Sequence, residues 1–283
     1  MTTHKRSVSV VIPTFNRANM LNTAIDSALR QTYPCEVIVV NHGSTDYTDE
    51  VALSYGKKIK YIKRKNDFGP HFAWLDGVLH ANGEYIHLQY DDDWIEPDFL
   101  EECIALFSED IGFVFSCANI FDQGSSQITQ VLFEDWADAS GAFRSKQFEH
   151  KIMRSLISPA AAVYRKQILL DALYQGRLPL SDAEYHGVGP DCLVTLLSIL
   201  RFKKIGFVKR PLATFRAHDA SITTAANREK EKAQEIRNAY DEVKRYYSEM
   251  KFLRFLRGLT LYRERKLLVC KSKTLVRKTL GKK

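Results

Sequence analysis

The sequence has few of the features that would place it in a specialised class. Its five cysteines are scattered among 283 residues and form no Cys-x-x-Cys pair, which argues against a disulfide framework or a structural zinc site and favours a reducing compartment. No apolar run reaches the roughly 20 residues that a membrane-spanning helix requires. The first residues lead into a strand-like segment and lack the apolar stretch of a signal peptide. We therefore expect a globular protein of the cytoplasm.

Two common nucleotide-binding motifs are also missing. The chain contains neither G-x-G-x-x-G nor G-x-x-x-x-G-K-[ST]. Both motifs bring glycine backbone against phosphate groups, so their absence removes the main support for a dinucleotide dehydrogenase or a P-loop ATPase.

Acidic residues are almost absent from the C-terminal end. Residues 251–283 carry seven Lys and five Arg against one acidic residue, Glu264, which gives this segment a net charge of +11 and leaves −4 for the first 250 residues. Leu, Phe and Tyr are interleaved with the basic residues. The pattern predicts a peripheral helix on an anionic membrane, at the inner face of the cell membrane. The alternatives are a solvated helix that completes the domain and, less favoured because the body is acidic, a nucleic-acid-binding tail.

Short apolar segments alternate with helical patterns over the first 120 residues. Segments rich in β-branched residues predict strands, and periodic apolar residues between them predict helices. The strands are expected at 8–12, 36–40, 60–64 and 85–89. Strands and helices that alternate with short links predict an α/β fold, with a mainly parallel sheet flanked by helices.

The middle of the chain is harder to interpret. We expect a loop with at most an edge strand over 123–155, helices over 166–174 and from Asp191, and a strand pair broken by Pro211 over 207–215. These assignments rest on short apolar runs and on proline as a strand breaker.

A different pattern marks the C-terminal part. Apolar residues from Ile236 to Met250 recur at steps of four and three residues, which predicts a long amphipathic helix. We therefore divide the chain into a main domain of residues 1–227 and a basic, helical C-terminal region of residues 228–283.

Three consecutive carboxylates, Asp91, Asp92 and Asp93, follow the strand expected at 85–89. Adjacent negative charges repel one another unless a cation lies among them, and parallel α/β sheets bind ligands at the carboxyl ends of their strands. Carboxylate oxygens suit Mg²⁺ or Mn²⁺, which commonly bridge protein carboxylates and substrate phosphates. We therefore expect a divalent metal and a nucleotide diphosphate here, with a solvated acidic turn as the alternative.

The motifs around these strands resemble those of family-two glycosyltransferases. The resemblance is carried by Val-Val-Ile-Pro-Thr-Phe-Asn-Arg at 10–17, by Gly-Ser-Thr-Asp at 43–46, and by Gly-Glu-Tyr-Ile at 83–86 before the three aspartates. It implies a GT-A fold with a Rossmann-like sheet, a nucleotide-sugar donor, a divalent metal, and inversion at the anomeric carbon.

The resemblance also implies where the donor binds. Pro13, Thr14 and Phe15 would line the pocket for base and ribose. The family usually has two Asp before the Gly-Ser of the second motif, one of which accepts a hydrogen bond from a pyrimidine, whereas this chain has Asn41 and His42. An Asn carbonyl and a neutral imidazole can still accept that bond. A UDP-sugar is therefore the first choice, and dTDP- or GDP-sugars remain open.

For the acidic segment, the resemblance implies that Asp91 approaches the ribose and that Asp92 or Asp93 holds the metal on the diphosphate. Which of the three touches the ion stays open. His218, within Arg-Ala-His-Asp-Ala-Ser at 216–221, resembles a late family motif that reaches the diphosphate or the metal. A structural or exposed histidine is the alternative.

The sequence Gly-Val-Gly-Pro-Asp at 187–191 resembles the second acidic motif of the family. A sugar hydroxyl that attacks an anomeric carbon must lose its proton, and a positioned carboxylate can accept it. Asp191 is therefore the candidate base, although an Asp here also fits a helix cap. Asp182 and Glu184 in the preceding loop are weaker candidates.

Together, these features predict a metal-dependent, inverting glycosyltransferase that moves a sugar to a hydroxyl of a glycan or lipid-linked glycan, as in bacterial surface polysaccharide synthesis. A non-catalytic module of the same fold that binds a nucleotide sugar or glycan is the main alternative. Nucleic acid is not an expected partner.

Overall fold

The computed structural model describes residues 6–173, 189–218 and 230–280. Its strands are β1 (Val8–Thr14), β2 (Glu36–His42), β3 (Lys60–Arg64), β4 (Tyr85–Leu88), β5 (Trp94–Ile95), β6 (Ile111–Asp122), β7 (Gln127–Leu132), β8 (Gly141–Arg144), β9 (Ala162–Arg165) and β10 (Lys204–Ala217). Its helices are α1 (Ala18–Leu29), α2 (Thr48–Ser54), α3 (Pro70–His80), α4 (Phe99–Ala105), α5 (Ser145–Arg154), α6 (Lys166–Ala172), α7 (Pro190–Arg201) and α9 (Lys230–Leu280), with short 3₁₀ turns η1 (Gly56–Lys58) and η2 (Pro159–Ala161).

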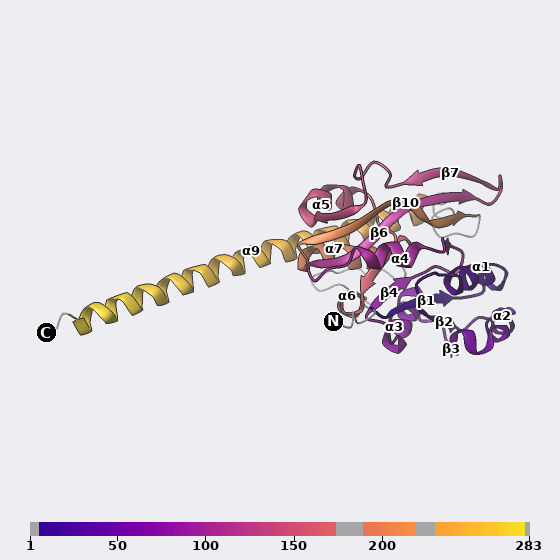
Figure 1. The fold of residues 1–283 in the computed structure, drawn as a ribbon, viewed down its shortest axis with the longest axis horizontal. Coiled ribbons are helices and arrows are strands. Elements are labelled where there is room, and N and C mark those ends of the chain that lie inside the picture. Colours follow the sequence, from indigo (N-terminus) through magenta and orange to yellow (C-terminus); the bar gives the residue numbers. More distant parts are fainter. Residues whose placement is uncertain (1–5, 174–188, 219–229, 281–283) are drawn as a thin grey trace.

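The strands form one sheet in the order β3-β2-β1-β4-β9-β6-β10-β5, with β7 added on β6 and β8 on β10. Helices lie around this sheet (Figure 1). Strands β3, β2, β1 and β4 are mutually parallel, so their carboxyl ends lie at one edge. Strand β9 runs antiparallel to both of its neighbours, β4 and β6. The α/β fold with helices around the sheet is confirmed, and its sheet is mixed because of β9 and the short strands β5, β7 and β8.

The four early strands lie where their apolar runs predict them. Strand β1 is buried along its whole length, as is β2 after its first residue, because helices cover both faces. Strand β3 is the expected edge strand and is only partly buried. These strands position the residues that follow them.

The expectation of a loop over 123–155 is wrong, because this stretch contains β7, β8 and α5. Its apolar residues are too sparse to show a period, but its aromatic side chains pack together. Phe133, Trp136 and Phe148 each contact the ring of Phe115 on β6. This aromatic cluster, and not a repeating pattern, anchors the segment to the sheet.

The expected strand pair over 207–215 is a single strand, β10. Its pairing with β6 changes register between Val208 and Pro211 and again before Ala213. A proline lacks the backbone N–H that a regular ladder needs, and a bulge accommodates it without ending the strand.

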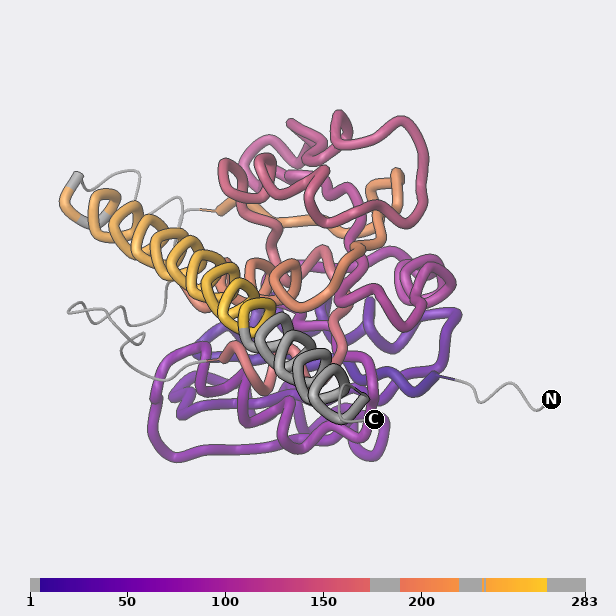
Figure 2. The backbone as a smooth tube through the Cα atoms, turned by 90° about the vertical axis from the view of Figure 1, so that its left-hand side faces the viewer, coloured from indigo at the N-terminus to yellow at the C-terminus, as the bar shows by residue number. Residues whose placement is uncertain are grey.

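Helix α9 is the long amphipathic helix expected from the sequence. Its first half belongs to the core, where Ala239, Val243, Tyr246 and Tyr247 are buried. Its second half projects from one side of the body (Figure 1), and Figure 2 views the molecule from that side. Within the described parts of the chain, no helix is both long and apolar enough to span a membrane. The proposed domain boundary after residue 227 lies outside the described residues.

Candidate active site

The carboxyl ends of β1 and β2 bring the first motif residues together. Pro13 and Thr14 are buried at the end of β1, whereas Phe15 just beyond it is 37% exposed. The ring of Phe15 stacks on that of His42 at the end of β2, with ring centroids 5.3 Å apart. An exposed aromatic ring beside a polar one provides a surface on which a planar base can lie.

Asn41 is fully buried, and both polar atoms of its amide are hydrogen-bonded within the protein. Its Oδ1 accepts a bond from the Ser44 backbone N–H at 2.9 Å. Its Nδ2 donates to Asp49 Oδ1 at 2.8 Å and to the Tyr61 hydroxyl at 2.9 Å. This buried amide therefore holds the turn after β2 together.

His42 has a different arrangement, because its Nδ1 lies 2.6 Å from Asp67 Oδ1. A carboxylate only accepts hydrogen bonds, so Nδ1 carries a proton, and in the neutral imidazole Nε2 is then an acceptor. Asp67 also accepts the Gly69 N–H at 2.7 Å, which fixes it in the turn before α3. Asp67 was not among the candidates found in the sequence, because only the fold brings it to His42.

Two nitrogen-bearing side chains, those of His218 and Arg17, contact Asp92, the second of the three aspartates. His218 Nε2 lies 3.0 Å from Asp92 Oδ2, and the Arg17 guanidinium donates to the same oxygen. Arg17 Nη1 also lies 3.8 Å from Asp91 Oδ1. A cation, Arg17, therefore already lies among the aspartates, and it comes from the loop between β1 and α1.

Asp93 connects the acidic segment to β10. Its Oδ1 accepts the Arg216 backbone N–H at 2.9 Å, and Arg216 Nε donates to the Asp92 carbonyl at 3.0 Å. The Arg216 guanidinium lies over the Trp94 ring, 5.2 Å from its centroid. One carboxylate oxygen of Asp93 therefore already has a structural role.

Burial raises the pKa of both Asp91 and Asp93, and the negative charge of Asp92 adds to this effect. The carboxylates thus cost free energy in their charged form, and additional positive charge at this edge would relieve that cost.

The described residues contain no group of three or more His, Cys, Asp or Glu side chains arranged to hold a metal ion. Asp92 and His218 nevertheless converge within 3.0 Å. Mg²⁺ in nucleotide sites commonly takes one or two protein ligands and completes its shell with phosphate oxygens and water. The two side chains present fit an ion that is shared with a diphosphate.

Asp191 lies in the first turn of α7 and is buried. Its Oδ1 accepts the Cys192 backbone N–H at 2.8 Å, and its Oδ2 accepts the Tyr240 hydroxyl of α9 at 3.0 Å. Burial is the main cause of the raised pKa of Asp191. Burial and then the charge of Asp191 raise the pKa of Tyr90, so Asp191 interacts electrostatically with the residue that directly precedes the aspartates.

Two of the expected site residues cannot be placed, because Asp182 and Glu184 lie outside the described residues. The partners missed in the sequence are Arg17, Asp67 and Tyr240. Arg17 could have been noticed, since it ends the first motif. The other two lie in segments that carry no motif.

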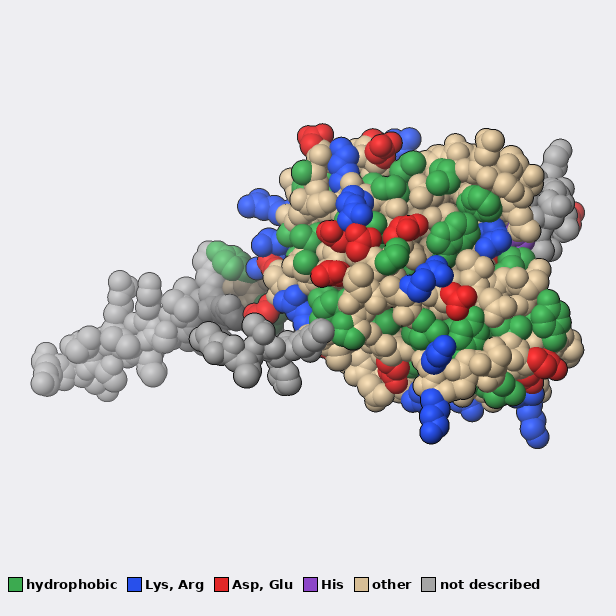
Figure 3. All heavy atoms as spheres, turned by 45° about the vertical axis from the view of Figure 1, so that its right-hand side comes forward, with side chains coloured by type: hydrophobic (Ala, Val, Ile, Leu, Met, Phe, Trp, Pro, Cys, Tyr) green, Lys and Arg blue, Asp and Glu red, His purple; other side chains and the backbone are tan. Residues whose placement is uncertain are grey.

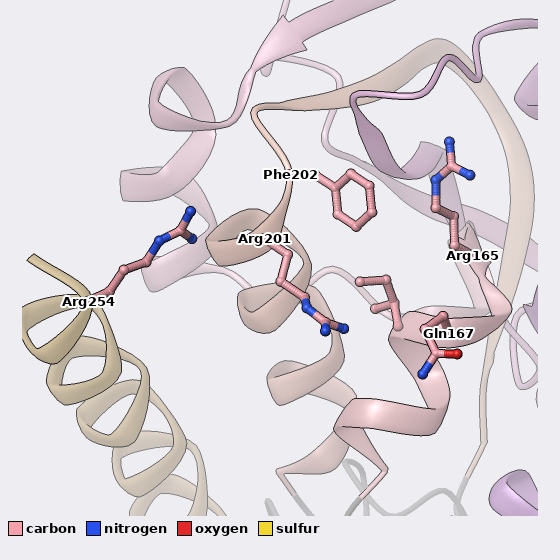
Figure 4. A pocket seen from close by; sticks show the side chains of 6 residues that line it. Arg165, Gln167, Arg201, Phe202 and Arg254 are labelled. Carbon is pink, nitrogen blue, oxygen red and sulfur yellow. The ribbon is translucent and has the colours of Figure 1, made fainter. Parts of the chain in front are cut away.

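A separate cavity of about 480 Å³ lies at the opposite edge of the sheet (Figure 4). Arg165, which pairs with the first residue of β4, lines it together with Arg201 and Arg254. These arginines already contact Glu84, Asp171 and the Leu200 carbonyl, respectively. The cavity is therefore distinct from the site at the carboxyl ends of the strands.

Comparison with known proteins identifies related sequences. The model of glycosyl transferase family 2 matches residues 9–171. An uncharacterised glycosyltransferase of Rickettsia typhi is 43% identical over 108 residues, which are 38% of this chain and 34% of the relative. The putative glycosyltransferase EpsH of Bacillus subtilis is 25% identical over 222 residues, which are 76% of this chain and 62% of EpsH. The matched region thus spans a third of the first relative and less than two thirds of the second.

Solved structures share the fold at low sequence identity. Staphylococcus aureus TarS 1–349 in complex with UDP superposes with a TM-score of 0.59 at 20% identity, covering 86% of this chain and 70% of that one. Glucosyl-3-phosphoglycerate synthase of Mycobacterium tuberculosis, bound to Mn²⁺, UDP and glucosyl-3-phosphoglycerate, gives 0.55 at 17% identity, covering 84% and 80%. The GT-A type of fold implied by the motifs is confirmed.

Proposed function

The chain belongs to glycosyl transferase family 2, and from this we propose that it transfers a sugar from a nucleotide sugar to a hydroxyl of a glycan or lipid-linked glycan, with inversion at the anomeric carbon. One observation carries the proposal: an exposed aromatic ring and the acidic segment follow neighbouring parallel strands at one edge of the sheet, and a buried carboxylate interacts electrostatically with the residue before the acidic segment. The aromatic ring is that of Phe15, which stacks on His42, and the buried carboxylate is that of Asp191.

The donor that we propose first is a UDP-sugar, with dTDP- or GDP-sugars as alternatives. Pro13, Thr14 and Phe15 would line the base and ribose pocket. Because Asn41 is fully buried and both polar atoms of its amide are hydrogen-bonded within the protein, we assign recognition of the base to His42. Solved relatives of the same fold were determined with UDP and with GDP-mannose, which is compatible with either choice.

Asp92 and His218 would hold a divalent cation, Mn²⁺ or Mg²⁺, and Asp91 would face the ribose. Such a cation would stabilise the negative charge of the leaving diphosphate. Asp93 is the weaker choice as a ligand, because its Oδ1 is bound to the Arg216 backbone. Arg17 supplies a further positive charge beside Asp91 and Asp92. Two solved relatives contain Mn²⁺, which supports this assignment.

Asp191 would act as the general base. As the acceptor oxygen bonds to the anomeric carbon and the bond from that carbon to the diphosphate breaks, the hydroxyl proton passes to the Asp191 carboxylate. A single displacement of this kind inverts the anomeric carbon and needs no covalent intermediate. Burial raises the pKa of Asp191, which strengthens it as a proton acceptor.

The projecting part of α9 would bind an anionic membrane, where a lipid-linked acceptor for surface polysaccharide synthesis would be found. Phe252, Phe255, Leu256 and Leu259 are exposed and spaced at i, i+3, i+4 and i+7, so they form one apolar stripe. Basic residues accompany this stripe and continue to the C-terminus. The face of the body in Figure 3, in contrast, mixes acidic, basic and apolar side chains.

The proposal is tested by measuring transfer and donor binding in the same variants. Asp191→Asn should lose turnover with any of UDP-, dTDP- or GDP-sugars but should still bind the donor that the parent prefers. The matched control is Asp171→Asn, which removes a carboxylate that pairs with Arg201 at the opposite edge, and it should turn over like the parent. A parent chain that binds a donor but transfers no sugar would instead be a binding module.

A further inference from the structure

Helix α9 reaches the candidate base directly. The Tyr240 hydroxyl donates to Asp191 Oδ2 at 3.0 Å, across 49 residues of sequence. The same helix also packs against Gly189, two residues before Asp191. A Cβ built on Gly189 would lie 3.0 Å from Val243 Cγ2, and its φ is +107°. The loop that ends in Asp191 is therefore in contact with α9 at two points.

We propose that Tyr240 is a positioning residue for catalysis, which orients the Asp191 carboxylate and keeps it ionised for proton transfer. This inference rests on the proposed function, because it assigns Asp191 the role of base. Oδ1 is held by the Cys192 backbone, so the Tyr240 hydroxyl fixes the second oxygen and with it the plane of the carboxylate. A base must point a lone pair at the proton that it removes.

The surroundings of Asp191 make this hydrogen bond important. Among the described residues, the ionisable groups that interact electrostatically with it are Tyr90 after β4, Tyr164 on β9, Cys192 on α7 and Tyr240 on α9. The positive charge of Lys244, one turn further along α9 than Tyr240, has a lowering effect on the pKa of Cys192. Burial disfavours the charged carboxylate, whereas the Cys192 N–H and the Tyr240 hydroxyl favour it. Tyr240 itself stays protonated, because burial and the charge of Asp191 raise its pKa.

The direction of the effect follows from this balance. A hydrogen bond to the charged form lowers a carboxylate pKa, so removal of the Tyr240 hydroxyl raises the pKa of Asp191. The base is active when it is deprotonated, so the acid limb of the kcat profile moves to higher pH. The loss of activity is then largest on the acid side and shrinks as the pH rises.

The experiment compares Tyr240→Phe with Tyr247→Phe in the full chain. Tyr247 is a matched control, since it is buried two turns further along α9 and donates to Glu149 Oε1, also at 3.0 Å. We expect the acid limb of Tyr240→Phe to rise by about one pH unit, with kcat about tenfold lower on that side. The KM for the donor should stay unchanged, and Tyr247→Phe should keep the limb of the parent. A carboxyl-carbon NMR titration of Asp191 reads the same pKa without turnover.

The outcomes separate this inference from the proposed function. If Asp191→Asn abolishes transfer but Tyr240→Phe keeps the acid limb and the Asp191 titration of the parent, the positioning role is wrong and the base assignment stands. An equal shift of the limb in Tyr247→Phe would also overturn the role, because it would then reflect general loosening of α9. If Asp191→Asn transfers sugar like the parent, the base assignment itself fails.

Discussion

The contact between His42 and Asp67 leads to a prediction about which nucleobase the chain accepts. His42 Nδ1 lies 2.6 Å from Asp67 Oδ1 and donates a hydrogen bond to it, so Nε2 is an acceptor in the neutral imidazole. Uracil and thymine carry an N3–H and guanine an N1–H that can donate to it, whereas N3 of cytosine has no hydrogen. We therefore expect UDP to bind more tightly than CDP, from which it differs only in the base.

Two substitutions test this prediction. His42→Phe keeps a ring to stack on Phe15 but removes the acceptor, and a buried N–H left unpaired costs about 1–3 kcal/mol, or about 5- to 150-fold in the Kd for UDP. Asp67→Asn allows either tautomer of His42, because an amide both donates and accepts, so the ratio of the Kd values for CDP and UDP should fall towards one. Calorimetric titration with both nucleotides in Mn²⁺ measures these changes.

A matched control for these variants is His80→Phe, since His80 also lies beside a carboxylate, that of Asp76, but on α3 away from the base pocket. It should bind UDP as the parent does. The reasoning is refuted if His42→Phe retains both the affinity for UDP and the discrimination against CDP.

Three further predictions concern the metal, the tail and the packing of α9. Excess EDTA should abolish transfer, and activity that persists would contradict a metal at Asp92 and His218. Truncation after Met250 should release the protein from anionic vesicles and preserve transfer to soluble acceptors, whereas unchanged vesicle binding would exclude the tail as the anchor. Gly189→Ala should lower the free energy of unfolding by about 1–3 kcal/mol in denaturant titrations, because of its positive φ and the contact with Val243, and an unchanged midpoint would contradict this.

The sheet edge that forms the site could be predicted because its strands are buried on both faces. Such strands appear in the sequence as continuous apolar runs, and the residues that follow each run, such as Phe15 or Asp91, must lie near the carboxyl end. The segment over 123–155 could not be predicted in this way. Its order depends on aromatic contacts with Phe115, which lies on another strand, and no local pattern records them.

The partners of the candidate residues were the part that sequence reasoning could not supply. Asp67 lies in a turn 25 residues after His42, and Tyr240 lies 49 residues after Asp191. In the sequence, Tyr240 reads as one more apolar position of an amphipathic helix, because its ring faces the core. Only the packing of α9 on α7 shows that the Tyr240 hydroxyl donates to the Asp191 carboxylate.

Arg17 changes what the acidic segment implies. Repulsion among three carboxylates suggests a bound cation, but a guanidinium from the chain itself already lies beside Asp91 and Asp92 and meets part of that need. Charge balance alone therefore does not require a metal. His218 makes the stronger case, because it brings a ring nitrogen to the same Asp92 oxygen that Arg17 contacts. An imidazole nitrogen and a carboxylate oxygen that lie 3.0 Å apart are a pair that can bind one metal ion.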